Sequence, residues 1–323
     1  MEYRFCGKSG LQLPLISLGM WHNFGDTDSF ANMQEIAFKA FDCGITHFDL
    51  ANNYGPPPGS AESNFGKILA RGLRNHRDEI VVSSKAGHLM WDGPYGDGGS
   101  RKYLMASIDQ SLRRTGLEYF DIFYSHRYCP ETPLEETVQA LIDIVKRGKA
   151  LYVGLSKYPV DKAMEACRMM AEQHVRCLIY QDRYSMISRK PEAEHLDFIR
   201  DLGLGFIAFS PLAQGLLTNR YINGIPADSR VAKSGVFLHR EDVTPELVEA
   251  IKALNEMAGR RGQSLAQMSL AWLLAKKDVV TSVIIGASSV KQLQDNMAAV
   301  DNLNFDEEEL SAIDNILSPF IKR

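Results

Sequence analysis

The chain has 323 residues, of which 45% are hydrophobic and 24% are charged, as in an ordinary globular protein. Its 36 Lys and Arg against 40 Asp and Glu give a formal net charge of −4, which argues against nucleic-acid binding through a basic excess and against a polybasic membrane anchor. No run of about 18 apolar residues occurs, so a membrane-spanning helix is not expected.

The N-terminal sequence and the cysteines favour the cytoplasm. The opening residues, MEYRFCGKSGLQLP, show neither the apolar core nor the cleavage site of a secretory signal. The 5 cysteines include no C-x-x-C pair, which favours reduced thiols over disulfides. The histidines lack metal-ligand spacing, so no metal site is expected.

Short apolar runs alternate with amphipathic stretches along the chain. A small hairpin is expected first, from residues 3–5 and 10–14. Most of the later apolar runs are continuous, which is typical of parallel strands covered by helices. These strand-like runs begin at Leu15, Ile45, Ile80, Phe120, Ala150, Cys177, Gly205 and Thr281.

Helical periodicity fills the intervals between these runs. Apolar residues recur every three or four positions over residues 30–41 and 134–145, and Gly44 and Gly148 are expected to end these helices. Residues 215–241 form an unusually long Gly-, Pro- and Arg-containing interval before two further helices. Long loops inside compact domains are usually functional.

This alternation predicts an α/β fold, a single (β/α)8 TIM barrel domain over residues 1–323. The hairpin would plug the N-terminal end of the barrel, and extra helices would lie toward the C-terminus. Length alone also allows two domains, but no linker divides the chain. The alternative fold is an open doubly wound sheet, whose G-x-G-x-x-G motif follows none of the strands.

Polar residues at successive strand ends indicate the chemistry, because a TIM barrel places its active site there. Asp49 ends the second strand with Tyr54 shortly after it, Lys85 ends the third and His126 follows the fourth. A lysine beside Tyr54 would favour the phenolate and make the tyrosine a better proton donor, and Asp49 would balance the lysine charge. A neutral His126 would orient a carbonyl oxygen. No side chain donates hydride, so a nicotinamide cofactor is expected.

Each of these residues has a purely structural explanation when taken alone. A strand-end lysine can face solvent, a lone histidine is more often structural, an aspartate can cap a loop, and a tyrosine beside prolines can be packing. The catalytic interpretation depends on the coincidence of four compatible groups at three successive strand ends.

Several segments resemble the aldo-keto reductase family, over nearly the whole chain. The most specific are GITHFDLANNYGPPPGSAE at residues 44–62 and LEYFDIFYSHR at residues 117–127. SSKAG (83–87), GKALYVGLSKY (148–158), FSPLAQGLLT (209–218) and IIGASSVKQLQDN (284–296) extend the resemblance. Within the family, SLGMWHNFG (17–25) with ANNYGPPPGSAE is similar to the branch of bacterial L-glyceraldehyde 3-phosphate reductases and potassium-channel β subunits.

The resemblance implies NADPH-dependent reduction of a small aldehyde, such as L-glyceraldehyde 3-phosphate or a methylglyoxal-like carbonyl, with the proton coming from Tyr54. It also implies a homo-oligomer. The implied catalytic residues are Asp49, Tyr54, Lys85 and His126, and the implied substrate contacts are Trp21, Tyr54, His126 and Arg127. The residues implied to hold NADPH are Trp21, Asp49, Ser156, Gln181, Tyr184, Ser210, Pro211, Leu212, Gln214, Gly215, Arg220, Arg230, Gly286, Ser288, Gln292, Asp295 and Asn296.

Within this set the resemblance implies distinct tasks. Ser156 and Gln181 would hold the nicotinamide amide, and Tyr184 would stack on its ring. Residues 210–215 would hold the pyrophosphate, and residues 286–296 the adenosine end. Arg220 and Arg230 would clamp the cofactor phosphates.

Two questions stay open at this point. Many family members bind the 2′-phosphate of NADPH through a lysine and an arginine, but near those positions this chain has Ala287 and Gln292. NADH is therefore the alternative cofactor to NADPH. The basic residues that could bind the 2′-phosphate instead are Arg220, Arg230 and Lys291. The second question is function, since an NADPH-binding, redox-sensing regulatory subunit is the alternative to an enzyme. The lack of an extension before the hairpin favours the enzyme.

Overall fold

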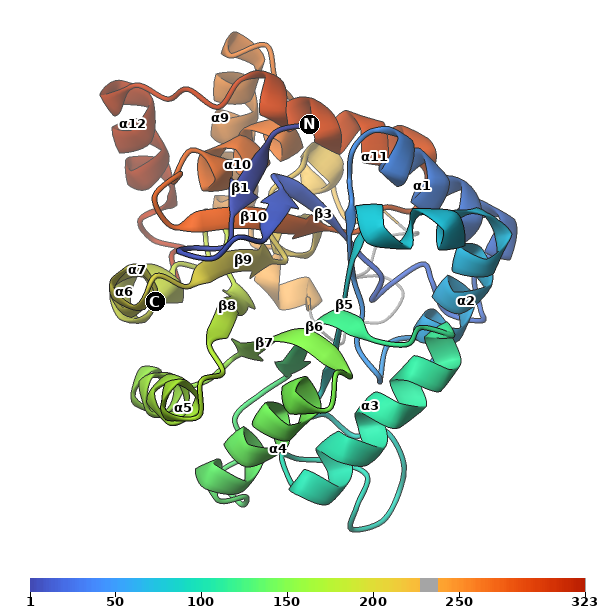
Figure 1. Ribbon diagram of the computed structural model, residues 1–323. Helices are drawn as coiled ribbons and strands as arrows, with labels where there is room; N and C mark the ends of the chain where they lie inside the picture. The colour runs from blue at the N-terminus through green and yellow to red at the C-terminus, as the bar shows by residue number, and fades with distance from the viewer. Residues whose placement is uncertain (227–237, 323) are drawn as a thin grey trace.

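A computed structural model describes residues 1–226 and 238–322 (Figure 1). Its centre is a closed barrel of parallel strands in the order β10-β3-β4-β5-β6-β7-β8-β9. The prediction of a (β/α)8 TIM barrel is therefore confirmed, and the open doubly wound sheet is wrong. The barrel strands are β3 (Ile16–Gly19), β4 (His47–Asp49), β5 (Val81–Ala86), β6 (Phe120–Ser125), β7 (Ala150–Ser156), β8 (Cys177–Arg183), β9 (Gly205–Phe209) and β10 (Val280–Ile285).

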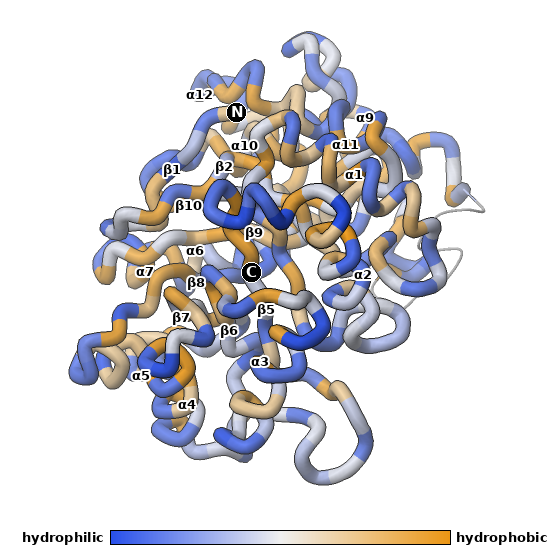
Figure 2. Tube along the Cα trace, turned by 45° about the vertical axis from the view of Figure 1, so that its right-hand side comes forward, coloured by the Kyte–Doolittle hydropathy of each residue, from blue (hydrophilic) through white to orange (hydrophobic). Residues whose placement is uncertain are grey.

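Helices surround the barrel and bury the outward-facing side of its strands. Because both faces of each strand are covered, β6 and β10 are buried along their whole length. In Figure 2 hydrophobic and hydrophilic stretches alternate along α4 and α5, as expected for helices with one face against the barrel. The helices following successive strands are α1 (Phe30–Asp42), α2 (Ser60–Ile68), α3 (Arg101–Thr115), α4 (Leu134–Lys146), α5 (Val160–Glu172), α6 (Lys190–Glu194), α7 (Leu196–Leu202), α10 (Leu265–Leu274) and α11 (Val290–Met297).

Glycine ends two of these helices as the sequence predicts. Gly44 follows α1 with φ of 84°, and its N–H donates to Phe41 O at 2.8 Å, while Ile45 N–H donates to Ala40 O at 2.9 Å. Gly148 does the same after α4, with φ of 68°. Only glycine adopts this left-handed conformation without steric cost, so each helix turns into the next strand at a fixed place.

The N-terminal hairpin of β1 (Tyr3–Phe5) and β2 (Gln12–Pro14) closes one end of the barrel. Cys6 and Leu13 are fully buried and join a cluster with inward-facing residues of β6, β8, β9 and β10. Arg4 Nη1 also donates to Val280 O at 2.9 Å, which ties the hairpin to the start of β10. These contacts confirm the predicted plug.

The length beyond a minimal barrel lies between β9 and β10 and after α11. The first insertion contains α9 (Pro245–Arg260) and the short 3-10 turns Ala213–Gly215, Asn219–Tyr221 and Arg240–Asp242. The second is α12 (Glu307–Leu317), which lies beside α9 in Figure 1. Within the described ranges, no helix combines the length and apolarity needed to cross a bilayer.

Candidate active site

A pocket of about 1200 Å³ opens where the barrel strands end at their carboxyl side. Asp49, Gln181 and Phe209 line it from β4, β8 and β9, as expected for a TIM barrel. The structure gathers most of the predicted site residues here, although they come from distant parts of the sequence. These residues are Trp21, Asp49, Tyr54, His126, Gln181, Ser210, Pro211, Leu212, Gln214, Gly215, Arg220, Gly286, Gln292, Asp295 and Asn296.

Lys85 lies fully buried beneath the pocket and organises its floor. Its Nζ is 2.6 Å from Asp49 Oδ2, 2.6 Å from Leu50 O and 3.3 Å from Tyr54 Oη. A lysine ammonium carries three hydrogens, and these three acceptors use all of them. Burial lowers the pKa of Lys85, and the Asp49 carboxylate opposes this shift.

Tyr54 accepts the Lys85 hydrogen bond, so its own hydroxyl hydrogen is available to another acceptor. Burial and the nearby Asp49 carboxylate raise the pKa of Tyr54 well above its usual range. The sequence argument expects Lys85 to favour the phenolate, whereas the structure places a protonated phenol at the pocket at neutral pH. The ammonium would stabilise negative charge on this oxygen only once the proton leaves.

His126 completes the predicted set, with its ring centroid 6.0 Å from that of Tyr54. Burial and the Lys85 charge lower the pKa of His126 well below its usual range, so the imidazole is neutral. His126 Nδ1 is buried and has no partner in the described part of the chain. The tautomer that carries its hydrogen on Nε2 leaves only a lone pair at that buried atom, and His126 can then donate from Nε2.

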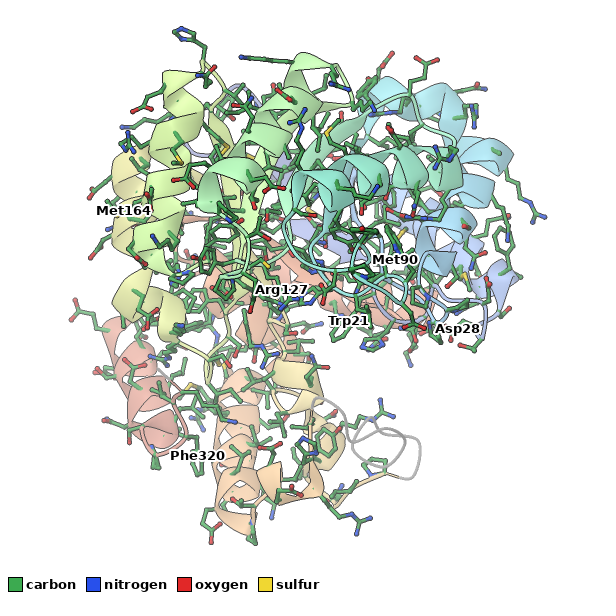
Figure 3. The ribbon with its side chains drawn as sticks, turned by 90° about the horizontal axis from the view of Figure 1, so that it is seen from below. Trp21, Asp28, Met90, Arg127, Met164 and Phe320 are labelled. Carbon is green, nitrogen blue, oxygen red and sulfur yellow. The ribbon has the colours of Figure 1, made fainter. Side chains whose placement is uncertain are left out.

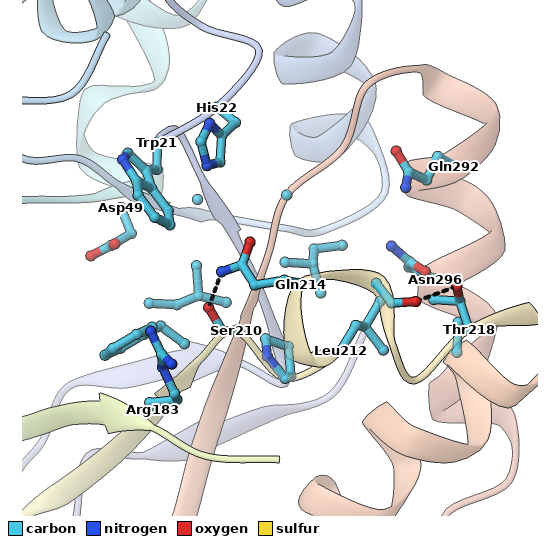
Figure 4. Close-up of a pocket in the computed structure, with 18 of the residues that line it drawn as sticks. Trp21, His22, Asp49, Arg183, Ser210, Leu212, Gln214, Thr218, Gln292 and Asn296 are labelled. Carbon is cyan, nitrogen blue, oxygen red and sulfur yellow. Dashed lines mark hydrogen bonds between the residues drawn. The ribbon is translucent and has the colours of Figure 1, made fainter. Parts of the chain in front are cut away.

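The loop after β9 has the shape of an anion cradle. Ser210, Ala213, Gln214 and Gly215 have φ values of 52°, 48°, 61° and 99°. A run of left-handed residues is strained, and such backbone concavities present N–H groups to anions. Figure 4 shows that Gln214 Nε2 bonds to Ser210 Oγ at 3.1 Å and that Thr218 Oγ1 bonds to Gly215 O at 2.7 Å, which holds the loop in this shape.

The buried polar atoms at the site that have no partner among the described residues include Ser156 Oγ and Asn296 Nδ2. Such atoms are costly unless a ligand completes them. Ser156 pairs in register with Gln181 at the ends of β7 and β8, and Asn296 lies at the opposite end of the pocket, on α11. Unsatisfied atoms at both ends and an anion cradle between them fit an extended dinucleotide.

Some predicted residues point away from the pocket in the described part of the chain. Ser288 bonds to Gln292 Oε1 through both its N–H and its hydroxyl. Arg127 Nε donates to Gly87 O at 2.7 Å and its Nη2 to Asp97 at 2.9 Å, which directs it to the loop before α3. Figure 3 shows Arg127 and Trp21 at the same edge of the barrel. Arg230 lies outside the described residues.

Tyr184 also lies away from the pocket, and its expected stacking on the cofactor needs correction. Its ring is fully buried between Phe206 and Trp272, and its hydroxyl donates to Glu192 Oε1 at 2.6 Å. From the neighbouring strand β9, Phe209 lines the pocket instead. The signal for it is its position directly before the Ser210 loop, at the end of β9.

Two cations lie at the pocket rim, namely Lys157, which the sequence places near the site as a possible phosphate contact, and Arg183, which the sequence argument missed. Lys157 Nζ lies 5.4 Å and the Arg183 guanidinium carbon 5.9 Å from the centroid of Phe209. Both line the pocket, and neither forms an ion pair with a described carboxylate. His88, the next basic group, is neutral because burial and the charges of Lys157 and Arg127 lower its pKa to about 4. In the described ranges, no group of acidic, histidine or cysteine side chains could hold a metal ion.

Comparisons with known proteins agree with this geometry. The chain matches the Aldo/keto reductase family model over residues 15–318. It is 53% identical to L-glyceraldehyde 3-phosphate reductase of Escherichia coli (strain K12) over 320 residues, which are 97% of this chain and 92% of that protein. It is 35% identical over 307 residues to a probable voltage-gated potassium channel subunit beta from Oryza sativa subsp. japonica, covering 93% of this chain and 92% of that protein.

Proposed function

Because the chain belongs to the aldo/keto reductase family, we propose that it reduces a small aldehyde to an alcohol with NADPH as the hydride donor. It is an enzyme, an oxidoreductase acting on small carbonyl compounds. The observation that carries the finer proposal is the Tyr54 phenol, held protonated at the pocket with a buried ammonium at 3.3 Å from its oxygen.

In this proposal the side chains supply the proton and the orientation. The hydride reaches the carbonyl carbon from the nicotinamide when the cofactor is bound. His126 donates from Nε2 to the carbonyl oxygen and orients it. Tyr54 transfers its hydroxyl proton to that oxygen, and Lys85 stabilises the phenolate that is left until water at the pocket mouth returns the proton. The products are the alcohol and the oxidised cofactor.

The cofactor would be held along the pocket. Ser156 and Gln181 offer polar groups for the carboxamide of the nicotinamide, and Phe209 offers an aromatic face for its ring. The cradle of residues 210–215 would receive the pyrophosphate, and Asn296 the adenosine end. Arg220 and Lys291 line the pocket where the adenosine end would lie. Two cations there suit the additional 2′-phosphate that distinguishes NADPH from NADH.

The substrate aldehyde would carry an anionic group such as a phosphate. Lys157 and Arg183 flank Phe209 at the rim without a described carboxylate partner. Two unpaired cations beside an aldehyde site suit a phosphate, because charge-assisted hydrogen bonds to it are strong. The name of the Escherichia coli relative points to the same substrate class.

A panel of aldehydes with and without a phosphate, assayed with NADPH and NADH in parallel, tests the proposal. We expect turnover with NADPH and the highest kcat/KM with a phosphorylated three-carbon aldehyde. The 35% identity to a potassium channel subunit makes a redox-sensing regulatory protein the second candidate. Tightly held NADPH with negligible turnover on every aldehyde would favour that candidate.

We also propose the cytoplasm as the compartment, since all of the cysteines are unpaired. The homo-oligomer and the single domain over residues 1–323 stay predictions. An independent measurement of mass in solution would test the first.

A further inference from the structure

A chain of hydrogen-bonded polar side chains crosses the interior of the barrel below Asp49. Ser282 Oγ lies 2.7 Å from Ser17 Oγ, Ser17 Oγ lies 2.9 Å from His47 Nδ1, and His47 Nε2 lies 3.0 Å from Ser83 Oγ. Ser83 Oγ then donates to Asp49 Oδ1 at 2.8 Å. The residues before Asp49 are all fully buried.

The strand pleat places these residues inside the barrel. His47 and Asp49 are two apart on β4, and Ser83 and Lys85 are two apart on β5, so each pair faces the same way. Ser84 faces outward instead, where its hydroxyl bonds Glu62 on α2. Below Gln181, β6, β8 and β9 contribute Ile122, Leu178, Ile179 and Ile207 to the apolar cluster under the hairpin, whereas the residues of the polar chain come from β10, β3, β4 and β5.

The direction of every hydrogen bond in the chain follows from the Asp49 carboxylate. Ser83 gives its only hydrogen to Asp49, so it must accept one from His47. The pKa of His47 is lowered to about 4 by burial, so the ring is neutral and carries a single hydrogen, on Nε2. His47 Nδ1 is then an acceptor, and the hydroxyl hydrogen of Ser17 must point to it.

The opposite polarity would bring two lone pairs together. A hydrogen on His47 Nδ1 would leave Nε2 facing the Ser83 oxygen at 3.0 Å with no hydrogen between them. Burying such an unsatisfied pair is costly. The alternative acceptor for Ser282, Leu15 O at 3.3 Å, is the longer of its two contacts.

This chain cannot deliver protons to the active site from solvent, because it ends at the fully buried hydroxyl of Ser282. The chain instead fixes the direction of the Ser83 hydroxyl, so that it always donates to Asp49 Oδ1. Gln181 Nε2 also reaches that oxygen, at 3.2 Å, but Gln181 lines the pocket and is proposed to bind the cofactor. Ser83 is the donor committed to Asp49, and it leaves Oδ2 to Lys85.

We propose that His47 is a positioning residue which, through Ser83, holds Asp49 so that Lys85 stays against the Tyr54 hydroxyl. The inference rests on the proposed role of Tyr54 as the proton donor. Loss of the hydrogen-bonded chain removes the Ser83 donor from Asp49, so the carboxylate can rotate and its negative charge is no longer shared with a hydrogen bond. The Lys85 ammonium can then move away from the Tyr54 hydroxyl. Both effects raise the pKa of Tyr54, while the pocket-lining residues other than Asp49 keep their positions.

The charges that face these groups are few. Asp49 and Lys85 act on the His47 ring, and Glu62 acts on Lys85 from behind β5. Ser83→Ala and His47→Leu each break the chain without changing any of these charges. His47→Gln restores a donor and an acceptor at similar positions. Ser84→Ala is the matched control, because it removes a buried hydroxyl from the neighbouring position on the same strand.

The first measurement is nuclear magnetic resonance of isotope-labelled histidine in the full-length protein, with the His47 signal assigned by its loss in His47→Gln. We expect a neutral ring with its hydrogen on Nε2, which does not titrate between about pH 5 and pH 9. A hydrogen on Nδ1, or titration of His47 in this range, would overturn the proposal. This readout needs no aldehyde turnover.

The second measurement is the pH dependence of kcat for aldehyde reduction. We expect Ser83→Ala and His47→Leu to lower kcat about tenfold, with KM and the NADPH Kd within about twofold of wild type. We expect their alkaline limb to move to higher pH, Ser84→Ala to keep the wild-type profile and His47→Gln to recover most of kcat. Equal profiles for Ser83→Ala and Ser84→Ala would overturn the proposal. If Tyr54→Phe retained turnover, the proposed function itself would fail, whichever tautomer His47 adopts.

Discussion

Lys85 donates a hydrogen bond to the Tyr54 oxygen over 3.3 Å, and this direction decides what the tyrosine can do. An oxygen that accepts from an ammonium keeps its own hydrogen for another partner, and the pocket is where that partner would lie. In the proposed reaction the pair would act as a proton donor whose conjugate base is stabilised by the buried Lys85 ammonium.

Tyr54→Phe is expected to lower kcat by about 10²- to 10⁴-fold, because the proton donor is lost while the ring remains. The Kd for NADPH, measured by fluorescence titration, should stay within about twofold of wild type. Tyr119→Phe removes a tyrosine hydroxyl far from the pocket, beside Arg77, and should leave both quantities unchanged. Near-normal turnover in Tyr54→Phe would contradict the assigned role.

Lys157→Gln and Arg183→Gln are expected to raise KM for a phosphorylated aldehyde about tenfold or more, because each removes a cation proposed to bind the phosphate. With an aldehyde that lacks the phosphate, KM should change less than about twofold. Lys162→Gln removes a lysine that is paired with Glu165 on the outside of α5, and it controls for a general change in charge. Equal effects on both aldehydes would rule out a phosphate subsite at these residues.

Gly215→Ala is expected to weaken NADPH binding about tenfold by straining the cradle after β9. Gly215 has φ of 99°, which an alanine adopts only at a cost of about 1 to 3 kcal/mol, although the new methyl group would meet the Tyr221 ring only at 3.6 Å. Gly259→Ala lies within α9 with open space around it, and it should stabilise the protein by up to about 1 kcal/mol. Calorimetric titration and thermal unfolding distinguish the two outcomes. Unaltered NADPH affinity in Gly215→Ala would remove the cradle from the binding site.

His47 makes the stability of the fold depend on pH in a defined direction. Its pKa is about 4 in the folded protein and about 6.5 in an unfolded chain, so between these values the unfolded state binds an extra proton. The contribution of neutral His47 to the free energy of unfolding should therefore be fully present above about pH 6.5. It should fall by on the order of 3 kcal/mol as the pH drops to about 4.

Urea unfolding at a series of pH values, with His47→Gln for comparison, checks this expectation. The variant should lose part of the slope in this window, up to about one proton. Some slope should persist, because His88 and His126 also have lowered pKa values and contribute with the same sign. An identical slope in the variant and the wild type would contradict the assignment of a buried, neutral His47.

The sequence predicted the fold and the site best where hydrophobic periodicity and the order of the strands are sufficient to place a residue. The barrel follows from the alternation of strand-like and helical segments, and the meeting of Asp49, Lys85 and Tyr54 follows from the rule that parallel strands end at one face. Tyr184 and Phe209 show where this rule stops. Tyr184 N–H donates to Phe209 O at 3.3 Å, so the two aromatic residues lie at the same level of neighbouring strands.

Their side chains nevertheless go to opposite sides, one to Trp272 and the other to the pocket. A single residue of register decides this outcome, because side chains alternate between the two faces of a strand. The sequence does not specify where each strand leaves the ladder. For the same reason Arg183 was identified as part of the pocket only when the end of β8 was seen, whereas Lys157 was expected near the site from its place after the fifth barrel strand.

The hairpin plug has a consequence at the far end of the barrel. By sealing the interior with Cys6 and Leu13, it keeps water away from the polar sector and so maintains a low dielectric around Asp49 and Lys85. Coulomb energies grow as the dielectric constant falls, so opposite charges interact far more strongly in a dry interior than in water. The two short strands at the start of the chain thus strengthen the interaction between Asp49 and Lys85. Water entering the barrel at its N-terminal end would weaken that interaction at the opposite end, where the pocket lies.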